Sequence, residues 1–147
     1  MSDIIDYGHG ISAIDSGYQR PRLDAIHLIV EGGRAAIVDT GVNSSVPRVL
    51  EALRAKGIAP AQVDYVVLTH IHLDHAGAAG TLLRRLPDAR LFVHSFGAKH
   101  MIDPTKLLAS ATRIYGDRMD RLWGAFDACP PDRVACFSMS FMPRDSS

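Results

Sequence analysis

Three histidines and one aspartate fall within six consecutive positions of this 147-residue chain: His70, His72, Asp74 and His75. Neutral imidazole and carboxylate are the side chains with which proteins hold zinc, iron and manganese. The apolar, β-branched run 66–68 comes directly before them and is typical of a buried strand. The sequence therefore predicts a metal site at the end of a strand, although a histidine-rich surface loop without metal is the alternative.

The spacing of these residues predicts two ions rather than one. Residues two apart point to the same side of an extended chain, so His70 and His72 can close on one ion while Ile71 packs inward. Asp74 and His75 are neighbours, which diverge in an extended chain and can therefore serve a second ion. Two ions roughly 3.5–4 Å apart can activate a water and polarise a substrate together.

The run from Thr69 to His75 resembles the T-H-x-H-x-D-H signature of the metallo-β-lactamase superfamily. Members include glyoxalase II-type thioesterases, lactonases, phosphodiesterases and some β-lactamases. The resemblance implies an α/β fold, the metallo-β-lactamase-like αββα sandwich. It also implies that Asp39, at the end of an earlier strand, supports the metal loop; on its own, Asp39 reads as a turn residue before a glycine.

The resemblance implies a zinc hydrolase in which a metal-bound hydroxide attacks an ester, thioester, lactone or related bond. Its metal ligands would be His70, His72, Asp74 and His75, and Asp74 would be the catalytic residue that orients or deprotonates the water. Two zinc ions are expected, and iron or manganese can occupy such ligands. Two alternatives are a catalytically inactive remnant that binds metal weakly or a protein partner, and a redox protein that holds iron.

The resemblance covers only the first half of such an enzyme. After Cys136 the sequence shows none of the histidines and the bridging aspartate that a second half would supply. We therefore interpret residues 1–136 as the N-terminal portion of the domain, from a truncated or frameshifted product, and residues 137–147 as an irregular tail. The loop offers each ion two ligands, whereas catalytic zinc usually has three. One sheet of a two-sheet fold would also expose an apolar face.

Composition favours one globular domain, and the resemblance implies that it acts on a small-molecule substrate. The 16 basic and 16 acidic residues cancel, and no basic cluster appears, so we expect neither nucleic acid nor membrane as a partner. Residues 1–6 lack the features of a signal peptide, which predicts a cytoplasmic location. Cys129 and Cys136 are expected to be reduced thiols, and oligomeric state is not readable.

Apolar spacing predicts the elements that position the loop. A hairpin is expected over 25–31 and 34–39, joined by two glycines, and an opening strand and turn before it. A helix capped by Ser44 or Ser45 and ended by Gly57 would cross over to a strand over 63–69. Further predictions are a helix after Gly77, a strand over 90–94, and a helical region from Thr105 to about 126 in which Gly116 is a candidate break. This region carries an apolar stripe: Tyr115, Met119, Leu122 and Phe126.

The other histidines have weaker claims to a role in the site. His9 lies between two glycines and is expected in a loop, while His27 falls on the polar side of a strand. His94 and His100 are the remaining candidates for metal ligation downstream of the loop. Trp123 and the rest of the helical region identify no substrate.

Overall fold

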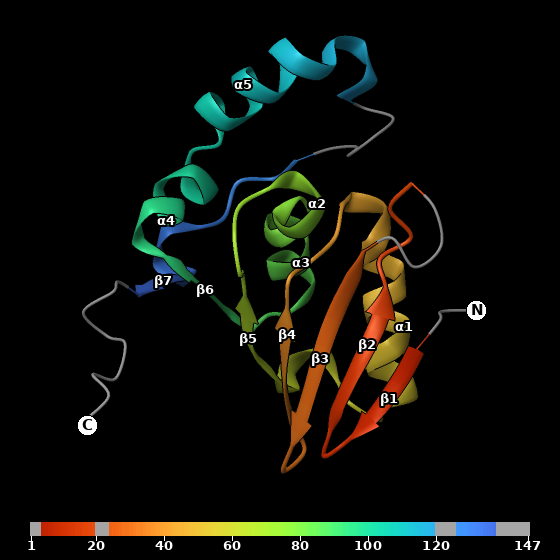
Figure 1. The fold of residues 1–147 in the computed structure, drawn as a ribbon. Coiled ribbons are helices and arrows are strands. Elements are labelled where there is room, and N and C mark those ends of the chain that lie inside the picture. Colours follow the sequence, from red (N-terminus) through yellow and green to blue (C-terminus); the bar gives the residue numbers. More distant parts are fainter. Residues whose placement is uncertain (1–3, 20–23, 120–125, 138–147) are drawn as a thin grey trace, which may run out of the picture.

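Seven strands form one mixed sheet with helices behind it (Figure 1). The computed structural model describes residues 4–19, 24–119 and 126–137. The strands follow the chain in spatial order: β1 Ile4–Gly8, β2 Ile11–Asp15, β3 Ala25–Glu31, β4 Arg34–Val38, β5 Val63–Val67, β6 Arg90–His94 and β7 Val134–Phe137. The helices are α1 Val46–Ala55, α2 Leu73–Ala76, α3 Ala79–Arg85, α4 Ser95–Ile102 and α5 Thr105–Tyr115. No described helix has the length and apolar character needed to span a membrane.

The first four strands form an antiparallel meander, and the last three continue the sheet in parallel. The predicted β3–β4 hairpin is present. Gly32 and Gly33 have φ of 59° and 75°, the left-handed values that a two-residue primed turn requires of both its central residues. This hairpin sends β4 toward the same edge of the sheet as β5.

Helix α1 makes the predicted crossover between β4 and β5. Its Val46, Val49 and Leu53 are buried against the sheet, as their helical spacing indicates. Ser45 occupies the N-cap position of α1, as predicted, but its side chain makes no capping hydrogen bond. Its hydroxyl instead donates to the Ser16 carbonyl at 2.6 Å and accepts from the Val42 N–H at 3.1 Å, which ties the loop after β4 to the end of β2.

The core lies between the sheet and the helices on one face. Leu28, Ile37, Val66 and Leu91 stand side by side on β3 to β6, and each is fully buried. The residues next to these along the strands point to the opposite face of the sheet. There Ile29 is 39% exposed and Tyr65 is 47% exposed. The exposed apolar face expected of a single sheet is therefore present, and the N-terminal portion of an αββα sandwich is confirmed.

Several elements differ from the sequence prediction. Strand β5 ends at Val67 rather than at Thr69, and neither α4 nor β7 was predicted. The helical region after Thr105 breaks where the sequence indicated: α5 ends at Tyr115, and Gly116 takes a φ of 55°. A short 3-10 turn follows, and residues 120–125, with Leu122 of the predicted stripe and Trp123, lie outside the described residues.

The remaining members of the stripe pack around the site end of the molecule. Tyr115, Met119 and Phe126 are partly buried against Val42 and Leu73. Both cysteines are free thiols, as expected. Burial raises the pKa of the Cys129 thiol to about 12, so it stays protonated and unreactive.

Candidate metal centre

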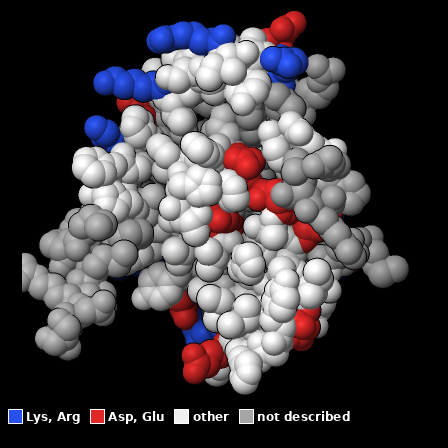
Figure 2. Space-filling view, in the orientation of Figure 1, with Lys and Arg blue, Asp and Glu red and all other residues white. Residues whose placement is uncertain are grey.

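The predicted loop lies where several strands bring their ends together. β4 and β5 are parallel, so Asp39 and the loop after Val67 leave the sheet at the same edge. β3 is antiparallel to β4, and its first residues therefore lie at that edge as well. Figure 2 shows acidic side chains gathered over this edge beneath α5, whose outer surface is basic. Ligands of α/β proteins bind at such an edge.

The loop is extended only in its first half. His70, Ile71 and His72 lie outside any helix or strand, and α2 begins at Leu73. The prediction that Asp74 and His75 continue an extended chain is therefore wrong, because both lie in the first turn of this helix. The turn brings the Asp74 Oδ2 within 3.2 Å of the His75 Nε2.

The three imidazoles nevertheless form one cluster. The ring centroids of His70 and His72 are 4.9 Å apart with the rings nearly perpendicular, and those of His70 and His75 are 4.1 Å apart. Ile71 and Leu73 pack inward as the alternation predicted, and Leu73 is 7% exposed. His70 and His72 are exposed, so their rings are open to solvent and to ligands.

Asp39 connects two of the histidines through hydrogen bonds. Its Oδ1 accepts from the Thr69 N–H at 2.9 Å, and its Oδ2 lies 2.9 Å from the Thr69 Oγ1. An ionised carboxylate only accepts, so the Thr69 hydroxyl donates to it and accepts from the His70 Nδ1 at 2.8 Å. The His75 Nδ1 donates to Asp39 Oδ2 at 3.2 Å. This network leaves the Nε2 atoms of His70 and His75 as acceptors for a cation.

The backbone around Asp39 holds this carboxylate in place. Asp39 has a φ of 63°, a left-handed conformation that aspartate adopts more readily than most residues. Its N–H donates to the Val67 carbonyl at 2.7 Å, and the next residue, Thr40, donates its N–H to the His75 carbonyl at 2.7 Å. Asp39 therefore supports the loop in the way that the resemblance implied.

Asp24 is a site residue that the sequence analysis missed. It directly precedes β3, its side chain is 6% exposed, and its Oδ1 lies 3.6 Å from the His75 Nδ1. Desolvation raises the pKa of the Asp24 carboxyl, with His75 acting in the opposite direction. The signal was the predicted hairpin, because an antiparallel β3 must start at the edge where β4 ends.

Asp24, Asp74 and His75 each offer a ligand atom, and these atoms lie within 4.8 Å of one another. Within the described ranges they form the only such group of three. Imidazole and carboxylate donors of this kind fit zinc, iron or manganese. The residues of this edge therefore fit a divalent cation.

Comparison with known proteins agrees with this geometry. Residues 21–126 match the family described as the Metallo-beta-lactamase superfamily. The chain belongs to this superfamily. It is 32% identical over 106 residues to the rubredoxin-oxygen oxidoreductase of Megalodesulfovibrio gigas, which covers 67% of this chain and 26% of that protein. It is 43% identical over 65 residues to a hydroxyacylglutathione hydrolase of Xanthomonas euvesicatoria, covering 44% and 23%.

A solved structure of a superfamily member confirms the predicted fold. The archaeal metallo-beta-lactamase superfamily protein ST1585 from Sulfolobus tokodaii superimposes with a TM-score of 0.69 at 25% identity. The match covers 88% of this chain and 49% of ST1585. The matched part of the chain thus spans between 23% and 49% of the length of these superfamily relatives.

Beside the metallo-β-lactamase loop lies a hollow of about 420 Å³ under α5. His72 and Asp74 form one side of it, Tyr18 adjoins them, and the apolar face of α5 lines the other side: Leu107, Ala111, Ile114 and Tyr115. Burial raises the pKa of Tyr18, and the nearby Asp74 carboxylate raises it further. A neutral phenol at this position can donate a hydrogen bond to a bound molecule.

The other histidines lie outside the group of three ligands. His94 is the last residue of β6 and the N-cap of α4, where its Nδ1 accepts from the Phe96 N–H at 3.2 Å. His100 is half-buried and lines a second hollow together with His70 and His94. His9, in a turn with a φ of 56°, and His27, on the outer face of β3, are exposed as expected.

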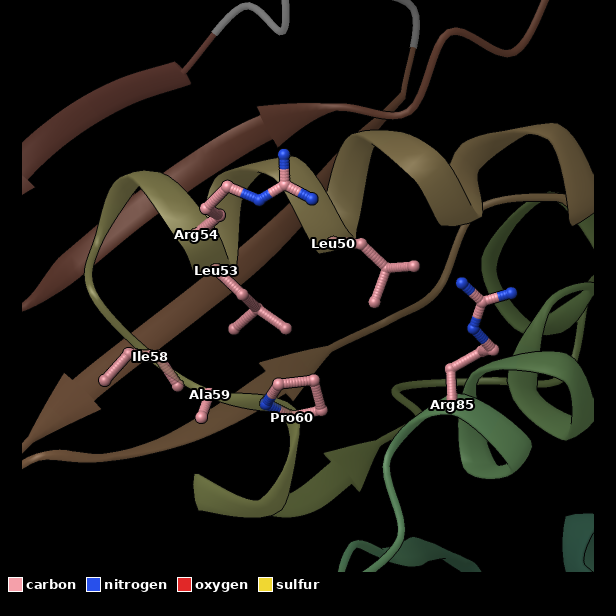
Figure 3. Close-up of a pocket in the computed structure, with 7 residues that line it drawn as sticks. All are labelled: Leu50, Leu53, Arg54, Ile58, Ala59, Pro60 and Arg85. Atoms are coloured by element: carbon pink, nitrogen blue, oxygen red, sulfur yellow. The ribbon is translucent and has the colours of Figure 1, made fainter.

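A third hollow shows how the opposite end of the molecule differs from the loop edge (Figure 3). It lies between the end of α1, the segment before β5, and α3, and it has a volume of about 330 Å³. Leu50, Leu53 and Ile58 line it, with Arg54 and Arg85 as its charged residues. It offers no imidazole or carboxylate and so carries no metal chemistry.

Proposed function

We propose that this chain is the metal-binding portion of a zinc-dependent hydrolase that cleaves a thioester, ester or lactone. The single observation that carries the proposal is the network around Asp39, which orients His70 and His75 beside Asp74. Such a network fixes the tautomers of ligating histidines, an arrangement common around catalytic metals. The similarity to a protein named hydroxyacylglutathione hydrolase supports hydrolysis of an acyl bond.

In this proposal each described residue has a distinct task. His70, His72, Asp74 and His75 hold the cations, and a bound zinc would acidify water and polarise the scissile carbonyl. Asp74 Oδ2 orients the attacking water and accepts its proton. The hollow under α5 receives the acyl portion of the substrate, because its walls combine apolar side chains with the Tyr18 hydroxyl.

The experiment compares two histidine variants of the full chain. His72→Ala should abolish hydrolysis of thioester and lactone probes, whereas His27→Ala, an exposed histidine on the outer sheet face, should leave it unchanged. Zinc should be near-stoichiometric in protein purified without added metal. Equal turnover by the His72→Ala variant would remove the loop from the mechanism.

A second function is favoured by one observation. The similarity to a protein named rubredoxin-oxygen oxidoreductase extends over 106 residues, more than the 65 matched by the hydrolase. Imidazole and carboxylate ligands also suit iron. The same metal analysis separates the two, because near-stoichiometric iron instead of zinc would favour an oxidoreductase.

A further inference from the structure

One oxygen at the loop edge lacks the partner that its burial demands. Asp24 Oδ2 is buried and accepts no hydrogen bond from any described residue. A buried carboxylate oxygen without a donor destabilises a folded chain, because it has lost its water and gained nothing in return. A buried polar atom of this kind calls for an explanation, and a bound cation is one.

The ion pair with His75 does not account for Asp24. The distance of 3.6 Å between Asp24 Oδ1 and His75 Nδ1 exceeds that of a hydrogen bond. The same Nδ1 lies closer to Asp39 Oδ2, at 3.2 Å, and a single N–H serves one close acceptor. Asp39 therefore holds the His75 ring. The Ser16 side chain forms a hydrogen bond with the Asp24 carboxyl, but the Oδ2 atom is left without a donor.

The neighbouring carboxylates make a buried negative charge on Asp24 still more unfavourable. The Asp39 and Asp74 carboxylates each raise the energy of its negative charge. Like charges in a partly buried group repel strongly unless a cation lies between them. Among the described residues, no lysine or arginine forms an ion pair with Asp24, and the Nδ1 of His75 already donates to Asp39.

We propose that Asp24 is the third protein ligand of the cation held by Asp74 and His75. This inference rests on the proposed function, since it concerns the same centre. Two carboxylates and one imidazole make a three-ligand set that suits a catalytic zinc with an open position. The second ion of the centre thus has a complete set within the N-terminal portion, where the signature loop supplies two of the three.

The alternative role for Asp24 is to position His75 as a second acceptor for its Nδ1–H. The two roles respond differently to Asp24→Asn. An asparagine keeps the shape and one accepting oxygen, so a positioning role would survive, whereas a ligand role would not because the amide is a poor ligand for zinc.

The test measures zinc alone binding to the full chain after its metal has been removed with a chelator. Zinc affinity is read by competition with a chromophoric chelator, and the absorption spectrum of the cobalt-loaded chain reports its ligand set. Asp24→Asn and Asp24→Ser should each weaken binding at one site by about tenfold or more and change the cobalt spectrum. Asp15→Asn is the matched control, because Asp15 is also buried, at 7% exposed, but pairs with Arg48 rather than with His75.

Melting of the metal-free variants supplies a second readout. Asp24→Asn should raise the melting temperature of the metal-free chain, since it removes an unpartnered buried charge, while lowering the stabilisation that zinc gives. Zinc affinity within twofold of the parent in both Asp24 variants, with binding lost in His75→Ala, would overturn the role of Asp24 and leave the proposed function standing. Absence of zinc binding in the parent chain would overturn both.

Discussion

The two ends of the central strands differ in which residues adopt left-handed backbone conformations and in whether their charged side chains are exposed or buried. At the amino end of β4, the left-handed turn residues are Gly32 and Gly33, which adopt positive φ without strain. At its carboxyl end Asp39 takes a left-handed φ of 63°, and Gly41 follows with a φ of 65°. Charges at the amino end are solvated and paired, as in the Arg34–Asp64 bridge, whereas the carboxyl end buries Asp39 together with Asp24.

The contrast in buried charge indicates that the amino end contributes stability and the carboxyl end is built to bind a ligand. Buried, mutually repelling carboxylates and a strained backbone reduce the free energy of unfolding, and such features cluster at functional sites. The relaxed amino end and the helix-covered core must supply the stability that the loop edge lacks. Substitutions at the two ends should therefore separate stability from metal binding.

The largest expected effect on stability lies at the amino end. Leu53 is 1% exposed and packs in the core near Ile58, so Leu53→Ala should lower the free energy of unfolding by about 2–5 kcal/mol through lost burial and a cavity. Urea denaturation of the metal-free chain measures this change. Zinc affinity of the folded fraction should stay as in the parent, and a parallel loss of affinity would show that the two ends are coupled.

The next effect belongs to the carboxyl end. Asp39→Asn keeps a residue that tolerates positive φ but replaces one accepting oxygen by an amide, so it cannot serve both Thr69 and His75. Zinc affinity should fall by about 10- to 100-fold, as for other partners of ligating histidines. Chelator competition measures the affinity. A variant that binds zinc as the parent does would show that Asp39 serves the turn alone.

Much of this contrast was predictable from the sequence. The hairpin, the crossover helix and the strand before the loop carry clear periodicities, because one face of each packs in the core. The resemblance of the loop to a known signature predicted that His70, His72 and His75 belong to one site. The sequence thereby located the carboxyl-end site, although the structure shows that part of its backbone is helical rather than extended.

The missed features depend on contacts between distant segments. Helix α4 contains Gly97, where a Cβ atom would meet the Ile71 side chain at 2.6 Å, so the residue that weakens its helical pattern is needed for packing on the loop. Strand β7 pairs only with β6 and follows residues without alternation. Asp24 was missed because only the folded sheet places it at the same edge as Asp39, and a local sequence pattern does not show this proximity.

The smallest effect is expected from the charges at the amino end. Arg34 donates from Nε to Asp64 Oδ2 at 3.1 Å, and this pairing holds the pKa of the Asp64 carboxyl below its usual value. Both side chains are solvated, so water replaces the contact when it is removed. Arg34→Ala should therefore change neither the urea midpoint nor zinc affinity measurably. A clear loss of stability would mean that the Arg34–Asp64 pair stabilises the amino end after all, contrary to the weak contribution expected of a solvated pair.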